Sequence, residues 1–174
     1  MAASTRYAET RAVLCTISNR TTFLTELRRI RTAHDVRIIC FNADMIAGRA
    51  HAVRALELAE RAFEAGENIS NTIEMEALLF AAGSRQCSVA SAFGIHEGEN
   101  RLYVCCRPER AEAWHEMGSL FNAAEEGFET IGPEKRANLV QAFSLSEAEI
   151  TAAGGDSRIP DLVLERVAML QVLR

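Results

Sequence analysis

A run of apolar residues between positions 71 and 82, with polar residues at both ends, predicts a buried helix in the middle of the chain. Asn71 can cap this helix, and Glu74 lies where a carboxylate reaches back to the amide of the capping residue. From Ala77 to Ala82 every side chain is apolar, which is typical of a buried helix. Gly83 ends the pattern, because glycine readily adopts the left-handed conformation that closes a helix.

Short runs of apolar residues predict three buried strands, at positions 12–17, 36–41 and 101–106. A helix from Thr22 to about Arg31 separates the first two strands, and this order resembles a βαβ unit. A fourth, short strand is predicted over positions 127–131. The length of 174 residues suits a single domain over positions 1–174 that is large enough to bury a core.

Further helices are predicted where apolar residues recur at helical spacing or where a proline stands in a first turn. They lie at positions 49–65, from Ser84 to Phe93, after Pro108, after Pro133, from Ser146 to Ala153, and over positions 160–173. Ser146 and Glu149 have the spacing of a capping box, which supports the start of the helix that they share.

The last predicted helix, over positions 160–173, carries apolar residues around its whole circumference. A helix of this kind must be covered on more than one side, yet a terminal helix seldom lies at the centre of a small domain. Two interpretations stay open. Either one face packs on this domain while another is offered to a partner, or the helix is buried entirely within its own domain.

The formal net charge of −5 is unevenly distributed along the chain. Positions 1–61 hold ten Arg against six Asp and Glu, whereas the remaining positions are strongly acidic. The acidic total argues against broad coating of nucleic acid, but the basic first third leaves room for one local site for a phosphate-bearing partner. Arg28, Arg29 and Arg31 form either such a site or the solvated face of a helix.

The five cysteines lack CxxC spacing, which argues against a disulfide framework or a zinc site and indicates buried free thiols in a reducing compartment. No apolar run approaches the roughly 20 residues that a membrane span requires. The first residues also lack the apolar core of a signal peptide. We therefore expect a cytoplasmic protein that has no membrane partner.

The sequence carries none of the P-loop, GxGxxG, GxSxG or HExxH motifs, and its four histidines are dispersed, so we expect no metal or other cofactor. Arg85 and Gln86 lie between two predicted helices, where an arginine fork could hold a phosphate or a base edge. Asn68 and Ser70 add polar groups at the other end of the central helix. These residues either bind a ligand or only stabilise turns and caps, and they offer no nucleophile–base pair for catalysis.

Several of these segments, taken in order, resemble a known family. They are FNADMIAG at positions 41–48, NISN at 68–71, MEALL at 75–79, GSRQ at 83–86 and the final apolar helix. Together they resemble the Cgi subunit of the KEOPS complex, the family of the PRPK-binding protein. The resemblance implies an α/β fold, in which a small mixed or antiparallel sheet is flanked by several helices.

The resemblance also implies a function. Proteins of this family are non-catalytic, regulatory subunits of a complex that forms threonylcarbamoyladenosine next to the anticodon of tRNA. They bind the RIO-like kinase subunit, which in turn docks on the threonylcarbamoyl transferase subunit. Archaeal members also grip the single-stranded CCA end of tRNA, and an acidic protein can do so through a local pocket.

On this basis the chain has two sets of candidate residues. The kinase-binding candidates lie on the last helix: Leu162, Val163, Val167, Met169 and Leu170. The RNA-binding candidates are polar residues around the central helix: Asn68, Ser70, Arg85 and Gln86, with Arg49 and His51 as secondary candidates. If the apolar face of the last helix is free, Val167→Glu should abolish kinase binding and leave the fold intact.

Two alternative functions stay open. The chain could be a small enzyme that acts on a phosphorylated metabolite at Arg85 and Gln86, although no acid–base pair accompanies them. It could also be a purely structural adaptor that binds the kinase and no RNA.

Overall fold

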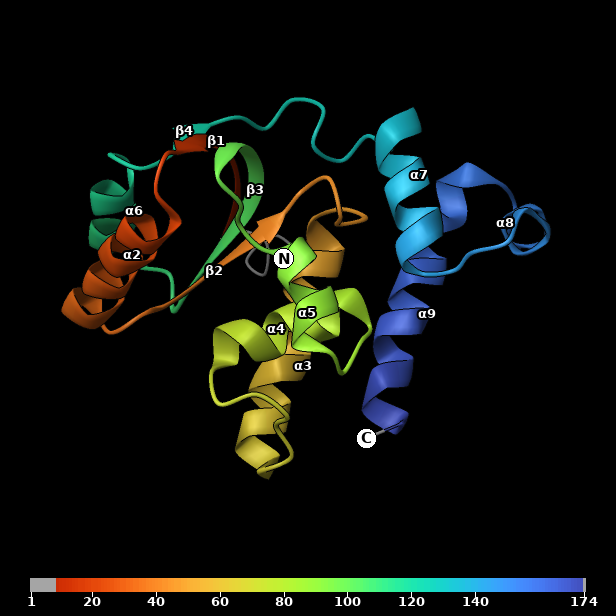
Figure 1. Ribbon diagram of the computed structural model, residues 1–174, viewed down its shortest axis with the longest axis horizontal. Helices are drawn as coiled ribbons and strands as arrows, with labels where there is room; N and C mark the ends of the chain where they lie inside the picture. The colour runs from red at the N-terminus through yellow and green to blue at the C-terminus, as the bar shows by residue number, and fades with distance from the viewer. Residues whose placement is uncertain (1–8, 174) are drawn as a thin grey trace.

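The computed structural model describes residues 9–173 and places a four-stranded antiparallel sheet at the centre of the protein (Figure 1). The strands are β1 (Thr10–Ile17), β2 (Arg37–Asn42), β3 (Gly98–Arg107) and β4 (Asn122–Ala123), in the spatial order β2-β3-β1-β4. Helices lie on both faces of the sheet, so the α/β fold class is confirmed and the antiparallel option is the correct one.

The first two strands are parallel but are not neighbours, and the resemblance to a βαβ unit left their pairing open. β3 lies between β1 and β2 and runs antiparallel to both, with Cys105 opposite Thr10 on one side and Ile39 on the other. Helix α2 (Arg20–His34) therefore connects two parallel strands that are separated by a third strand. Strand pairing of this kind depends on contacts far apart in sequence, which local patterns do not contain.

The two faces of the sheet build two separate apolar clusters because successive strand residues point to opposite sides. Helix α2 and helix α6 (Ala111–Met117) cover one face, where Phe23, Leu27 and Trp114 belong to one apolar cluster. Helix α3 (Arg49–Ala65) and helix α4 (Ile73–Ala82) cover the other, which holds the larger cluster.

The predicted central helix is helix α4, and its burial is confirmed. Thr72 rather than Asn71 caps it, since the hydroxyl of Thr72 accepts a hydrogen bond from the amide of Met75. The segment after Gly83 forms the short helix α5 (Cys87–Ala90) and one 3-10 turn, η1 (Ser91–Phe93).

Three helices follow β4: α7 (Pro133–Ala142), α8 (Glu147–Ala153) and α9 (Ile159–Val172). Helix α9 packs against α3 and α4, and α8 packs against α9. A 3-10 turn, η2 (Asp156–Arg158), precedes α9. Figure 1 shows these C-terminal helices on the opposite side of the molecule from α2 and α6. The predicted capping box at Ser146 and Glu149 is confirmed at the start of α8.

Two local predictions are wrong. The fourth strand is Asn122–Ala123, and positions 127–131 form a loop, because Phe128 is buried and its carbonyl oxygen accepts hydrogen bonds from Tyr103 and Lys135. The thiol of Cys87 is exposed, whereas those of Cys15, Cys105 and Cys106 are buried.

Within the described residues, no helix has both the length and the apolar character needed to cross a membrane.

Candidate partner-binding surfaces

Helix α9 presents two different faces, and four of the five candidate residues lie on the inner one. These four, each at most 9% exposed, are Leu162, Val163, Val167 and Leu170. They belong to the larger apolar cluster, where α9 packs against α3 and α4. The assignment of these four side chains to a free partner surface is therefore corrected: in this structure they hold α9 on its own domain.

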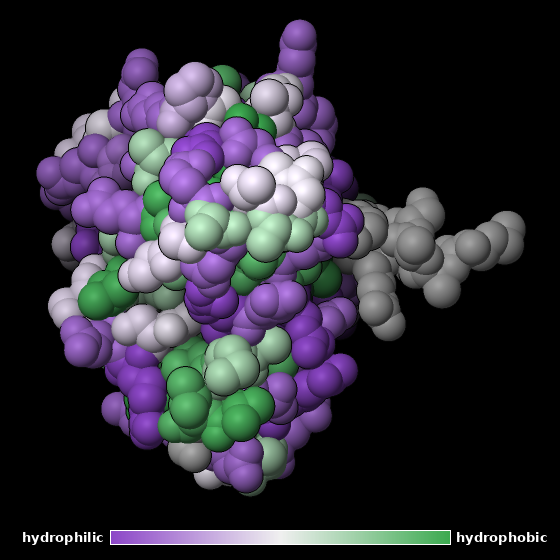
Figure 2. Space-filling view, turned by 90° about the vertical axis from the view of Figure 1, so that its right-hand side faces the viewer, coloured by the Kyte–Doolittle hydropathy of each residue, from purple (hydrophilic) through white to green (hydrophobic). Residues whose placement is uncertain are grey.

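The outer face of α9 is apolar only toward its C-terminal end. Met169, Val172 and Leu173 are 49%, 75% and 65% exposed, respectively, and they are called the α9 patch from here on. Figure 2, which looks onto this side of the molecule, shows apolar residues gathered in its lower part. A hollow of about 290 Å³ adjoins the patch, between Gly83, Phe143 and the end of α9. Large exposed apolar side chains grouped in this way are typical of an interaction surface.

Asn68 and Ser70 shape the loop that leads into α4, and a buried carboxylate holds this loop. Glu76 is fully buried, and its Oε2 accepts hydrogen bonds from the amides of Ile69, at 3.1 Å, and Ser70, at 2.8 Å. The side-chain amide of Asn68 donates to the carbonyl oxygen of Ser70 at 2.9 Å. Both candidate side chains are half-buried. Sequence reasoning missed this role of Glu76, although a glutamate directly before an entirely apolar run was a usable signal.

Arg85 and Gln86 lie at the other end of α4, and both are exposed. Nη1 of Arg85 donates to the carbonyl oxygen of Leu173 at 3.2 Å, which joins this end of α4 to the end of α9. The ten residues of α4 separate Arg85 from Ser70 by a helix length of about 15 Å. The structure therefore brings Arg85 to the α9 patch and does not bring it to Asn68 or Ser70.

His51 lies in the core, so a direct contact between its ring and RNA is incompatible with this structure. The ring is 1% exposed; Nδ1 accepts from the amide of Ala47 at 3.1 Å, and Nε2 lies 2.8 Å from the carbonyl oxygen of Ala81. Burial lowers the pKa of His51 to about 4, so the neutral ring with a proton on Nε2 satisfies both contacts. His51 thus ties the start of α3 to the end of α4.

Arg49 is also held by its own domain. Its amide donates to Oε1 of Glu129 at 2.9 Å, and its guanidinium pairs with the carboxylate of Glu125. It therefore stabilises the loop that follows β4, while a quarter of its side chain stays exposed.

The candidate residues at the end of α4 do not lie in an enclosed pocket. Arg85 and Gln86 lie on an open surface, which does not favour an enzyme that encloses a phosphorylated metabolite. Among residues 9–173, no group of three or more His, Cys, Asp or Glu side chains could hold a metal ion.

The fold and these surfaces define a small α/β protein whose candidate contact residues lie at the exposed ends of two packed helices. A family model described as kinase binding protein CGI-121 matches residues 14–171. The chain belongs to this family of kinase-binding proteins, which confirms the resemblance seen in the sequence. The comparison with curated proteins gives no match. The matched region includes all of α4 and nearly all of α9.

Proposed function

We propose that this chain is a non-catalytic, regulatory subunit of a cytoplasmic KEOPS complex and binds its RIO-like kinase subunit through the α9 patch. The observation that carries the proposal is the apolar outer end of α9, where Met169, Val172 and Leu173 are exposed on a helix anchored by four buried side chains. A preformed helix loses little conformational freedom on binding, so its exposed apolar residues can contribute most of the affinity. Through the kinase, the chain would act on the transferase that modifies tRNA.

The test is the affinity of the purified RIO-like kinase subunit for the whole chain and for a variant with Met169→Glu and Val172→Glu. Two charges within an apolar contact should weaken binding at least about tenfold. Gln171→Glu is the matched control, because it adds a charge at an exposed polar position of the same helix. Unchanged affinity of the double variant would place the kinase on another surface.

We further propose that the chain holds the single-stranded CCA end of tRNA near Arg85 and Gln86. Two features support this role: both side chains are exposed, and the net charge of −5 restricts RNA to a local contact. Asn68 and Ser70, at the far end of α4, would contact a different part of the RNA strand. Only the exposed quarter of the Arg49 side chain is accessible to RNA.

This role is tested by comparing tRNA with the same tRNA lacking its CCA end, at near-physiological salt. A specific site predicts that binding is lost with the CCA end and weakened by Gln86→Ala. Gln86 is the better probe, since Arg85→Ala would also remove the contact to Leu173 at the α9 patch. If both RNAs bind with equal affinity, and that affinity falls as salt rises, the attraction is non-specific. The chain is then a structural adaptor that binds the kinase without RNA.

A further inference from the structure

Strand β2 forms one edge of the sheet, and its outer backbone groups are unpaired. The amide of Ala43 donates to the carbonyl oxygen of Arg101, so alternate residues from Ala43 back to Ile39 point toward β3. Ile38 and Cys40 therefore direct their amides and carbonyl oxygens away from the sheet. Within residues 9–173 the structure records no hydrogen-bond partner for these outer groups. Ile38 is 3% exposed and Cys40 is half-buried, so a strand that pairs with them must enter between the helices that flank this edge.

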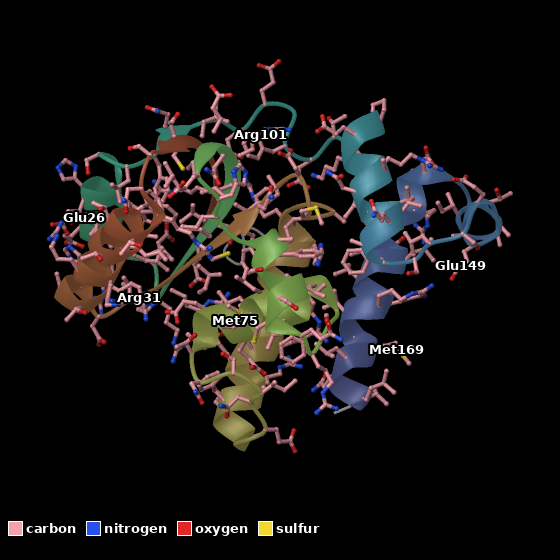
Figure 3. All side chains as sticks on the ribbon, in the orientation of Figure 1. Glu26, Arg31, Met75, Arg101, Glu149 and Met169 are labelled. Atoms are coloured by element: carbon pink, nitrogen blue, oxygen red, sulfur yellow. The ribbon has the colours of Figure 1, made fainter. Side chains whose placement is uncertain are left out.

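A groove of about 370 Å³ follows this edge between α2 and α4. Its floor includes Ile38, Ile39 and Cys40, and its walls carry apolar side chains from both helices: Leu24, Leu27, Met75 and Leu78. Leu24 is 40% exposed although it lies on the helix that covers the sheet. In Figure 3, the labelled residues Arg31, on α2, and Met75, on α4, mark the two walls of the groove.

The rim of the groove is basic. Arg20, Arg28 and Arg31 line it, and Glu74 is its only acidic lining residue within the described part of the chain. The guanidinium of Arg31 pairs with Glu74 across the groove, which joins α2 to α4, so a segment that lies along β2 must displace this ion pair. For residues 9–173, the structure shows no ion pair of Arg20 or Arg28. The carboxylate of Glu97 contacts the backbone here, since its Oε1 accepts from the amide of Arg20 at 3.4 Å. The groove therefore combines backbone donors and acceptors, apolar walls, and two arginine side chains that form no ion pair among residues 9–173.

We propose that this groove binds an extended acidic peptide segment of a partner protein, which adds to the sheet as a strand beside β2. The backbone of the segment pairs with Ile38 and Cys40, at the usual strand spacing of about 4.8 Å. Its alternate side chains face the apolar walls, and its carboxylates meet Arg20 and Arg28. This surface lies away from the α9 patch, so it provides a second protein contact that is separate from kinase binding.

The test uses the full chain, labelled with ¹⁵N, and a synthetic acetyl-Asp-Val-Asp-Val-Asp-Val-amide peptide. Titration to millimolar concentration should shift the amide resonances of Ile38 and Cys40 and slow their hydrogen exchange. Arg28→Glu should weaken binding by about fivefold, because it replaces an attraction by a repulsion. Arg61→Glu is the matched control, since Arg61 is exposed on α3 away from the groove.

Strand addition is separated from simple charge attraction by the same peptide with alternate backbone nitrogens methylated. This peptide keeps its charge but cannot form the ladder, so its binding should be lost. Equal binding of the methylated peptide would overturn the proposal, and so would resonances of Ile38 and Cys40 that do not move. An oligodeoxythymidylate that shifts these resonances, when the peptide does not, would assign the groove to nucleic acid instead.

Discussion

At the scale of single residues, the burial of His51 has a direct consequence for stability. The ring is enclosed between α3 and α4, and burial lowers its pKa from 6.5 to about 4 in the folded protein. The unfolded chain therefore takes up a proton between these two values while the folded protein does not. The contribution of the neutral His51 ring to the unfolding free energy is therefore fully present above pH 6.5, and it is lost as the pH falls toward 4.

We predict that His51→Gln removes much of this pH dependence. Between about pH 7 and about pH 5, His51 should cost the wild-type protein about 2 kcal/mol of unfolding free energy. Urea unfolding followed by circular dichroism at both pH values measures the difference. Glu149, whose pKa is lowered by hydrogen bonds from the Ser146 amide and from Arg166, is present in both proteins and cancels. Equal slopes for the two proteins would show that His51 is not held neutral.

Residue-scale features were predictable only where sequence neighbours create them. Ser146 and Glu149 of the capping box lie only three positions apart, and the structure reproduces the box. The contact of Arg85 with Leu173 joins residues 88 positions apart, and no local pattern contains it. The sequence therefore identified polar groups at both ends of α4 but could not show that Arg85 meets α9.

At the scale of elements, α9 shows where helical periodicity reaches its limit. The sequence pattern predicted a helix whose own apolar side chains cover its whole circumference. It therefore could not decide which face of the helix packs inward. The packing of α9 against α3 and α4 makes that choice and buries Val167 completely. Strand β4 was missed for a different reason: it is only two residues long, which is too short for a pattern of apolar residues to detect.

The two faces of α9 lead to opposite predictions for the same substitution. Val167→Glu buries an unpaired charge and should lower the unfolding free energy by about 3–5 kcal/mol, which replaces the earlier expectation of an intact fold. Met169→Glu adds the same charge to a half-exposed position and should change stability by only about 0.5 kcal/mol. Urea unfolding of both variants is the measurement. A Val167→Glu protein as stable as the wild type would mean that α9 is not packed as described.

At the scale of the whole molecule, one loop connects the sheet to the C-terminal helices. Phe128 is buried in this loop, with its ring edge-to-face with Tyr103 at a centroid distance of 5.7 Å. Its carbonyl oxygen accepts hydrogen bonds from Tyr103 on β3 and from Lys135 on α7, each at 2.9 Å. Figure 1 shows the chain passing over the top of the molecule between β4 and α7. Phe128 therefore couples β3 to the helices that carry the α9 patch.

We predict that Phe128→Ala destabilises the protein by about 3–5 kcal/mol and loosens α7, α8 and α9 before the sheet. Hydrogen exchange under native conditions should show faster exchange in these helices than in α2 and α6. Phe121→Ala is the matched control, because Phe121 is also buried but packs with Phe23 on the opposite face of the sheet. Its effect should fall on α2 and α6 instead. If both variants accelerated exchange equally throughout the chain, the molecule would unfold as one cooperative unit, and the α9 patch could not change its order independently of the sheet.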